Sequence, residues 1–292
     1  MAEPKKLTDV FNARTTKETH TLIPHPVTGR RIDNHPGQRT IPMKVLVLGA
    51  SRTGTMSMFA ALEKLGYQPY HLAKALQAPK SNLDVWREGL EAKYHGKGKP
   101  FGRKEFDAIM GGYDICSDVP VICFAEELIE AYPDAKIIIN HRDVDKWLIS
   151  MNNTAGVIWK WNWAWLAPWD KQLVDPFWRF GEMVMVCFYK TLNDFSPESP
   201  AREAFLEHYR KLRKAAPPER TLEYQVQDGW RPLCEFLSVP VPEGEFPRIN
   251  DASQFIVAHR VMWWLAFGKM VMKTSAVPVA LGVMAIAWYW IK

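Results

Sequence analysis

One short stretch, residues 49–57 with the sequence GASRTGTMS, holds the side chains best suited to bind an anion. An apolar run from Val45 to Leu48 precedes it, and an apolar pattern at helical spacing follows it. A glycine-bearing turn between a buried strand and a helix points backbone N–H groups and the positive helix end at one spot. The stretch therefore predicts a phosphate-binding loop, whereas the plainer interpretation is a turn that only connects strand and helix.

This loop departs from the two common nucleotide-binding patterns. In the pattern GxxxxGK[ST], Thr55 replaces the lysine and Met56 replaces the hydroxyl that binds magnesium. The pattern GxGxxG fails because Ser51 stands at its second glycine. What remains is a cradle with its own cation, Arg52, and no metal is expected in it. Metal-free binding of a 5′ phosphate favours sulfuryl transfer, since the sulfuryl group carries less charge than a phosphoryl group.

A second candidate site lies in residues 139–150, INHRDVDKWLIS. Arg142 lies just past the carboxyl end of a buried strand, where open α/β sheets bind ligands. Ser150 comes eight residues later, which places it about two helical turns on and near the same face. The arginine and the hydroxyl could grip a second phosphate of the same nucleotide. An Arg-Asp pair at a strand end is also common as a structural salt bridge.

Strands and helices alternate along the chain, which predicts an α/β protein with a parallel sheet. We expect a three-layer fold of the phosphate-loop type, in which helices flank the sheet on both sides. Residues 1–42 form an extended arm in this interpretation, residues 43–255 the α/β domain, and residues 256–292 an apolar helical tail.

Several motifs together resemble the sulfotransferase family. GASRTGTMS followed by RDVDKWLIS resembles the two phosphate-binding motifs of sulfotransferases that use 3′-phosphoadenosine-5′-phosphosulfate (PAPS). A fungal-rich branch of sulfotransferase-like proteins is more similar still, because SDVP, YPDAKIII, GWRPLCEFL and FPRIND also occur here in order. The resemblance covers about residues 40–255. It implies a PAPS-dependent transferase that leaves 3′,5′-adenosine bisphosphate as product.

The resemblance also implies roles for individual residues. Arg52 takes the place of the lysine that bridges the donor's sulfate and phosphate, and Arg142 and Ser150 hold the 3′ phosphate. The residues expected around the 5′ phosphate are Ser51, Arg52, Thr53, Gly54, Thr55, Met56 and Ser57. The glycine-rich basic motif that closes over the 3′ phosphate has no counterpart here, and Arg248 is the candidate substitute.

The general base is not where the family pattern has a histidine. Asp118 occupies the corresponding position and could accept a proton from an acceptor hydroxyl. Alternatively, its side chain caps a helix that begins at Val119-Pro120. His71, at the end of a predicted strand, is the second candidate base, and a structural role suits it equally well.

The net charge and the tryptophan content indicate which partners the protein could bind. The net charge of +5 is carried by scattered basic residues, which does not favour a nucleic-acid partner. Seven of the thirteen tryptophans lie between residues 147 and 178: Trp147, Trp159, Trp161, Trp163, Trp165, Trp169 and Trp178. They predict either a lid over an apolar small-molecule acceptor or a flap that lies on a membrane or on neighbouring helices.

The C-terminal tail predicts a membrane anchor. Ser275 to Ile291 has no charged residue, and its 17 residues are marginal for crossing a bilayer as a helix. Lys269 and Lys273 precede it, which predicts that the catalytic domain faces the cytosol. We expect the protein at the cytosolic face of a membrane such as the endoplasmic reticulum. The alternatives are a cytoplasmic protein whose tail packs on its own domain, and a homodimer that pairs the tails. Two functions rival sulfuryl transfer. The sulfotransferase-like fold could catalyse another reaction, or the chain could be a membrane-bound binding protein without catalytic turnover.

Overall fold

Five parallel strands form the centre of the fold in this computed structural model, which describes residues 22–77, 81–249 and 252–291. The strands are β1 (Val45–Val47), β2 (Pro69–Tyr70), β3 (Ile115–Ser117), β4 (Lys136–Asn140) and β5 (Thr221–Tyr224). Their order across the sheet is β2-β3-β1-β4-β5, and every neighbouring pair is parallel. The predicted α/β class with a helix-flanked parallel sheet is confirmed.

Successive residues of β1 send their side chains to opposite faces of the sheet. Val45 and Val47 pack with α2 (Thr55–Lys64) and α12 (Trp230–Leu237) on one face. Leu46 and Leu48 belong to the larger core on the other face. Both faces are thus buried under helices, as the uninterrupted apolar run of β1 predicts.

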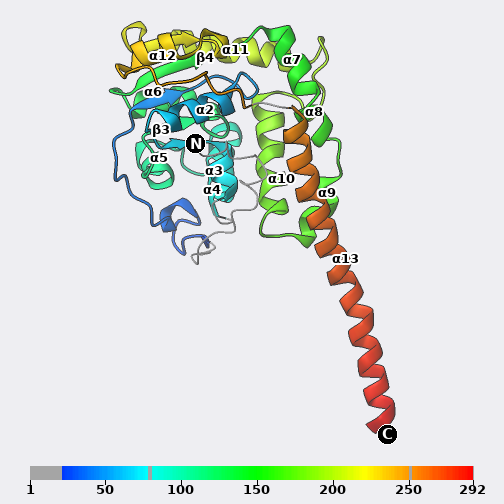
Figure 1. The fold of residues 1–292 in the computed structure, drawn as a ribbon. Coiled ribbons are helices and arrows are strands. Elements are labelled where there is room, and N and C mark those ends of the chain that lie inside the picture. Colours follow the sequence, from blue (N-terminus) through cyan, green and yellow to red (C-terminus); the bar gives the residue numbers. More distant parts are fainter. Residues whose placement is uncertain (1–21, 78–80, 250–251, 292) are drawn as a thin grey trace.

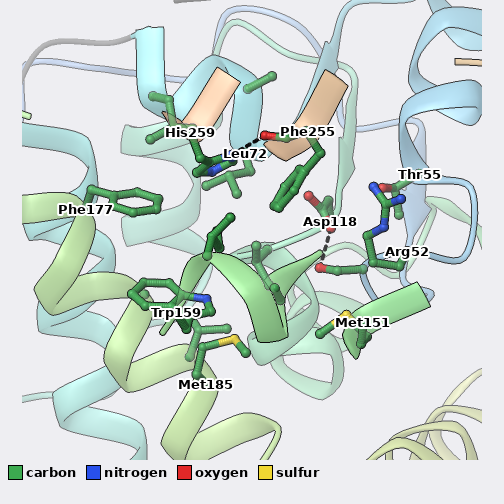
Figure 2. A pocket seen from close by; sticks show the side chains of 18 of the residues that line it. Arg52, Thr55, Leu72, Asp118, Met151, Trp159, Phe177, Met185, Phe255 and His259 are labelled. Carbon is green, nitrogen blue, oxygen red and sulfur yellow. Dashed lines mark hydrogen bonds between the residues drawn. The ribbon is translucent and has the colours of Figure 1, made fainter. Parts of the chain in front are cut away.

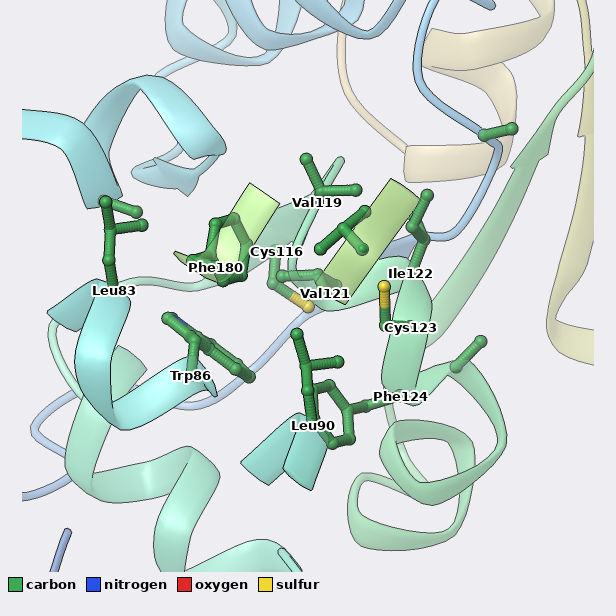
Figure 3. Packing of buried hydrophobic residues seen from close by; sticks show 14 of the residues in the cluster. Leu83, Trp86, Leu90, Cys116, Val119, Val121, Ile122, Cys123, Phe124 and Phe180 are labelled. Atoms are coloured by element: carbon green, nitrogen blue, oxygen red, sulfur yellow. The ribbon is translucent and has the colours of Figure 1, made fainter. Parts of the chain in front are cut away.

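The larger core is built around aromatic residues of α4 (Ser81–His95). Trp86 is fully buried, and its indole lies 5.5 Å from the ring of Phe124 between ring centroids (Figure 3). Phe180 of α10 (Val174–Met183) belongs to the same cluster. This packing fixes α10 against α4 and so positions one wall of the cavity described below.

The remaining helices connect these layers. They are α3 (Leu72–Gln77), α5 (Arg103–Met110), α6 (Ala125–Ala131), α7 (Val144–Asn152), α8 (Ala155–Ile158), α9 (Trp163–Leu166) and α11 (Pro200–Ala215). A π-helical turn, Val184–Phe188, continues α10, and a 3₁₀ turn, Val121–Phe124, precedes α6.

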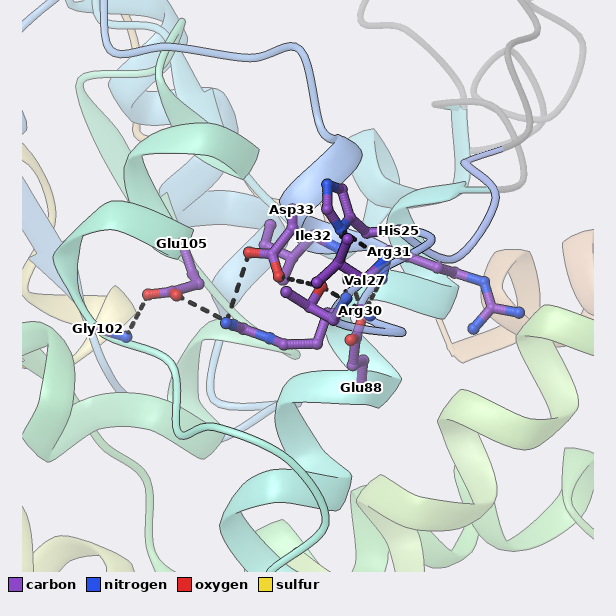
Figure 4. Close-up of polar contacts among 10 residues, drawn as sticks. His25, Val27, Arg30, Arg31, Ile32, Asp33, Glu88, Gly102 and Glu105 are labelled. Atoms are coloured by element: carbon purple, nitrogen blue, oxygen red, sulfur yellow. Dashed lines mark hydrogen bonds and ion pairs between the residues drawn. The ribbon is translucent and has the colours of Figure 1, made fainter.

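Residues 22–42 run along α4 and α5 (Figure 4). Glu88 accepts hydrogen bonds from the backbone amides of Arg31 and Ile32, at 3.0 and 3.3 Å. Arg30 forms an ion pair with Glu105 at 3.0 Å. The first half of the predicted arm, residues 1–21, lies outside the described residues, and the predicted domain boundaries stay a prediction.

A single long helix, α13 (Ala252–Ile291), ends the chain (Figure 1). Its first half contacts α8 and α9, and Lys269 donates to the buried carboxylate of Asp170 at 2.6 Å. Its second half extends away from the body of the protein (Figure 1). Among helices with described side chains, the Ala252–Ser275 part of α13 is long and apolar enough to cross a membrane. Within its most apolar stretch, 28% is buried against the rest of the protein.

Candidate active site

The loop between β1 and α2 has a backbone that only a glycine accommodates at residue 54. Gly54 has a φ of +95°, and a Cβ atom there would lie 2.0 Å from Cγ2 of Val226. Arg52 is also left-handed, with a φ of +68°. A non-glycine residue in this region costs about 1–3 kcal/mol, and such strain concentrates at ligand sites. The conformation therefore turns the chain sharply into α2.

Buried polar side chains from other elements hold the start of this loop. Its first three amides donate to such side chains: Gly49 to Oδ1 of Asn140 at 3.0 Å, Ala50 to the hydroxyl of Tyr209 at 3.1 Å, and Ser51 to the hydroxyl of Tyr189 at 3.2 Å. Thr53 accepts from Nδ2 of Asn140 at 2.6 Å. These groups therefore maintain the shape of the loop.

The amides that can face an anion are those at the start of α2. The first helical hydrogen bond of α2 runs from the amide of Met58 to the carbonyl of Gly54. The amides of Thr55, Met56 and Ser57 precede it and have no acceptor within the helix. Together with the positive end of the helix, they are the groups that could bind an anion, and anion binding itself stays a prediction.

Arg52, Arg142 and Ser150 lie together beside this cradle, although they are far apart in the sequence. Nε of Arg52 donates to the hydroxyl of Ser150 at 3.4 Å, and Nη1 of Arg142 donates to the backbone carbonyl of Arg52 at 3.2 Å. Asp143, the neighbour of Arg142, caps α7 by accepting from the amide of Lys146. The predicted two-part phosphate site thus has its basic and hydroxyl groups in one place.

Two further predicted residues lie near the first turn of α2. The hydroxyl of Ser57 accepts a hydrogen bond from the backbone amide of Ile249 at 3.0 Å. This contact brings the segment with Arg248 beside α2, and the Arg248 side chain is exposed to solvent. Its role at the 3′ phosphate stays a prediction.

Asp118 does not cap the following helical turn, so that alternative is wrong. The turn begins at Val121 and has Pro120 at its cap position without a side-chain hydrogen bond. Oδ1 of Asp118 instead accepts from the hydroxyl of Ser51 at 2.6 Å. Asp118 has a φ of +59°, and this left-handed backbone directs its carboxylate toward the loop between β1 and α2.

The two candidate bases face each other. Nε2 of His71 lies 3.3 Å from Oδ2 of Asp118, and both side chains are buried. Burial lowers the pKa of His71, while the nearby Asp118 carboxylate opposes this shift. Burial thus favours the neutral form of the His71 ring.

A cavity of about 140 Å³ opens beside these polar groups (Figure 2). Ser51, Arg52, Thr55, His71 and Asp118 line its polar end. Its other walls are largely apolar and come from α3, α8 and the residue after it, α10 and the π-helical turn that continues it, and α13; they include Leu72, Ile158, Trp159, Phe177, Met185 and Phe255. The cavity is comparable in size to an engineered apolar cavity of about 150 Å³ that binds benzene.

The tryptophans of the 147–178 segment lie in different environments, and neither predicted role is tested by this arrangement. Trp159 lines the cavity and stacks on Phe177, with 5.4 Å between ring centroids and 8° between ring planes. Its indole lies against Gly181, where a Cβ atom would come within 2.2 Å of the ring. Trp163 is fully buried in the core, whereas Trp165 is 47% exposed. The segment is thus partly cavity wall, partly core and partly surface.

Sequence reasoning missed the contribution of α13 to the cavity. Phe255 and His259 line it, and the Phe255 ring lies 5.4 Å from Cζ of Arg52. Nδ1 of His259 donates a hydrogen bond to the backbone carbonyl of Phe255 at 2.8 Å (Figure 2). The sequence does contain a hint of this contribution, because Phe255 and His259 are four residues apart and therefore lie on one face of a helix.

Fold and site define an α/β protein with a glycine-bearing loop after its first strand and a largely apolar cavity beside that loop. Residues 44–255 match the family model for the sulfotransferase domain, and the chain belongs to this family. It is also 37% identical over 251 residues to Ava biosynthesis cluster protein M of Aspergillus versicolor. That match covers 85% of this chain and 96% of the relative.

Proposed function

We propose that the protein transfers a sulfuryl group from PAPS to the hydroxyl of an apolar small molecule. One observation carries the proposal: Arg52 of the predicted donor cradle and the pair Asp118–His71 line the same cavity. A donor held at the start of α2 and an acceptor in the cavity would meet there. Membership of the sulfotransferase family supports the reaction type.

The donor side is suited to a nucleotide with two phosphate groups. The amides at the start of α2 and the guanidinium of Arg52 offer positive charge to the 5′ phosphosulfate. Arg142 and Ser150, both in contact with Arg52, offer a second anion site for the 3′ phosphate. Charge that develops on the departing phosphate would be stabilised by donors already in position.

The acceptor side favours a flat apolar molecule with one hydroxyl. Apart from its polar end, the cavity is walled by aliphatic and aromatic side chains, among them Trp159, Phe177 and Phe255. A charged or highly polar acceptor would lose its hydration there without compensation. A hydroxyl at the polar end would lie beside Asp118 and His71.

We further propose that α13 anchors the protein at the cytosolic face of a membrane. Its exposed apolar side chains include Val257, Val261, Trp264, Leu265 and Met272, and the uncharged stretch Ser275 to Ile291 follows them along the helix. An exposed apolar surface of this kind typically marks contact with a membrane or a partner. Phe255 and His259 line the cavity from the same helix, so an apolar acceptor would approach from the lipid side.

Calorimetry and a transfer assay test the function. The protein should bind 3′,5′-adenosine bisphosphate, and it should move ³⁵S from labelled PAPS to an aromatic alcohol such as 2-naphthol. Failure to bind the bisphosphate would indicate that the donor site serves another reaction. Binding without transfer to any of a panel of apolar alcohols would indicate a binding protein.

A further inference from the structure

His71 has a buried polar atom with an unfilled hydrogen-bonding capacity. Its Nε2 has no hydrogen-bond partner among the described residues, although the side chain is 6% exposed and lines the cavity. Nε2 lies 3.3 Å from Oδ2 of Asp118 but is not aligned with it for a hydrogen bond. A buried donor without a partner costs about 1–3 kcal/mol, so an atom of a ligand is the expected partner.

The other ring nitrogen fixes which tautomer His71 adopts. The backbone amide of Ala73, in the first turn of α3, donates to Nδ1 of His71 at 3.1 Å. Nδ1 must then carry a lone pair, and in a neutral imidazole the proton resides on Nε2. The amide of Ala73 can donate only to an unprotonated Nδ1, so this contact requires the neutral ring, and burial, which lowers the pKa of His71, favours the same form. Nε2 therefore presents an N–H group to the cavity and cannot accept a proton there.

Asp118 offers the complementary group at the same place. The Ser51 hydroxyl donates to its Oδ1, which orients the carboxylate and leaves Oδ2 on the side of His71. An oxygen atom in the cavity can lie about 2.8 Å from both Nε2 and Oδ2, since these two atoms are 3.3 Å apart. Such an oxygen would accept from His71 and donate to Asp118, which describes a hydroxyl group.

We infer that Asp118 is the general base and that His71 binds the acceptor oxygen as a hydrogen-bond donor. This inference rests on the proposed function. The acceptor O–H bond breaks as its proton moves to Asp118, and the acceptor oxygen forms a bond to sulfur. The bond from sulfur to the bridging oxygen breaks, and its electron pair stays on the phosphate of 3′,5′-adenosine bisphosphate. Asp118 gives its proton to solvent when the products leave.

A matched pair of variants separates this arrangement from one in which His71 is the base. His71→Gln keeps an N–H donor near the position of Nε2 but cannot act as a base, whereas His71→Leu has neither capacity. We expect His71→Gln to keep ³⁵S transfer to 2-naphthol within about 10-fold of wild type, and His71→Leu and Asp118→Asn to lose about 10²–10⁴-fold. Equal loss in both His71 variants, with an active Asp118→Asn, would overturn the inference.

The tautomer can be measured without any acceptor. Nuclear magnetic resonance of protein labelled with ¹⁵N-histidine, with His71→Gln used for assignment, should show the His71 proton on Nε2 at neutral pH. A proton on Nδ1 would overturn the inference. Calorimetry with 3′,5′-adenosine bisphosphate on the same samples keeps the two proposals apart. Absent binding in the wild type counts against the proposed function, whereas the tautomer reports on His71 alone.

Discussion

Replacing Arg142 by alanine should convert the donor site from one that selects a 3′ phosphate into one that does not. In the structure, Nη1 of Arg142 donates to the carbonyl of Arg52, and the guanidinium has further N–H groups for a phosphate. The observed contact with the Arg52 carbonyl and the proposed contact with the 3′ phosphate predict different results for the alanine variant. Loss of a phosphate contact affects only nucleotides with a 3′ phosphate, whereas loss of the contact to the loop affects all of them.

The magnitude follows from the kind of bond that is lost. A hydrogen bond to a charged group contributes about 1.5–3 kcal/mol, which corresponds to a rise in Kd of about 10- to 150-fold. The Kd for 3′,5′-adenosine bisphosphate should rise by this factor in Arg142→Ala. The Kd for adenosine 5′-phosphosulfate, which lacks the 3′ phosphate, should change by less than about 3-fold.

Calorimetric titration of both nucleotides into both proteins closes a thermodynamic cycle. Arg202→Ala is the matched control, because Arg202 forms its ion pair with Asp145 of α7, and its loss should leave both Kd values unchanged. Equal weakening of the two nucleotides in Arg142→Ala would show that Arg142 supports the loop through Arg52. That result would refute the assignment of the 3′-phosphate site.

Four further outcomes are expected. Arg52→Ala should lower the rate of transfer by about 10²–10³-fold, measured with labelled PAPS, because one preorganised donor is lost. Gly54→Ala should lower the free energy of unfolding in urea by about 2–5 kcal/mol, and Val226→Ala in the same chain should restore only the part due to the clash. Deleting residues 276–292 should release the protein into the soluble fraction with its affinity for the bisphosphate intact, whereas a full-length protein that is soluble without detergent would contradict the anchor. Burial lowers the pKa of His208 to about 4, so the unfolded chain takes up a proton at this residue below about pH 6.5 that the folded chain does not; this residue should contribute about 2 kcal/mol to the loss of stability between pH 7 and pH 5, and the loss should be smaller by that amount in His208→Gln.

The fold was predictable because its signals are local. The apolar runs of β1 and β4 and the glycine turn after β1 depend on neighbouring residues alone. The same holds for the loop from Gly49 to Gly54 and for the placement of Arg142 just after β4. Such patterns are typical of parallel sheets whose strands are covered on both faces.

The walls of the cavity were not predictable, because they come from side chains far apart in the sequence. Phe255 reaches the cavity from α13, and Tyr189 directly follows the π-helical turn after α10. Nothing near Asp118 in the sequence indicates that its carboxylate would bond to Ser51 and face His71. The local sequence around Asp118 suggests a helix cap. The left-handed backbone at this residue instead directs its carboxylate to Ser51.

The partners of the anion loop also constrain the order of events during synthesis of the protein. The amide of Ala50 is bonded to Tyr209, which lies 159 residues later, and Ser57 is bonded to Ile249, 192 residues later. Contacts of such long sequence separation form late, because a large loop must close before they contribute. A nascent chain that ends before residue 209 would therefore carry the strand, the turn and the helix together with Asn140 and Tyr189, but without the contacts from Tyr209 and Ile249. The loop should reach its final shape only as the last quarter of the chain leaves the ribosome.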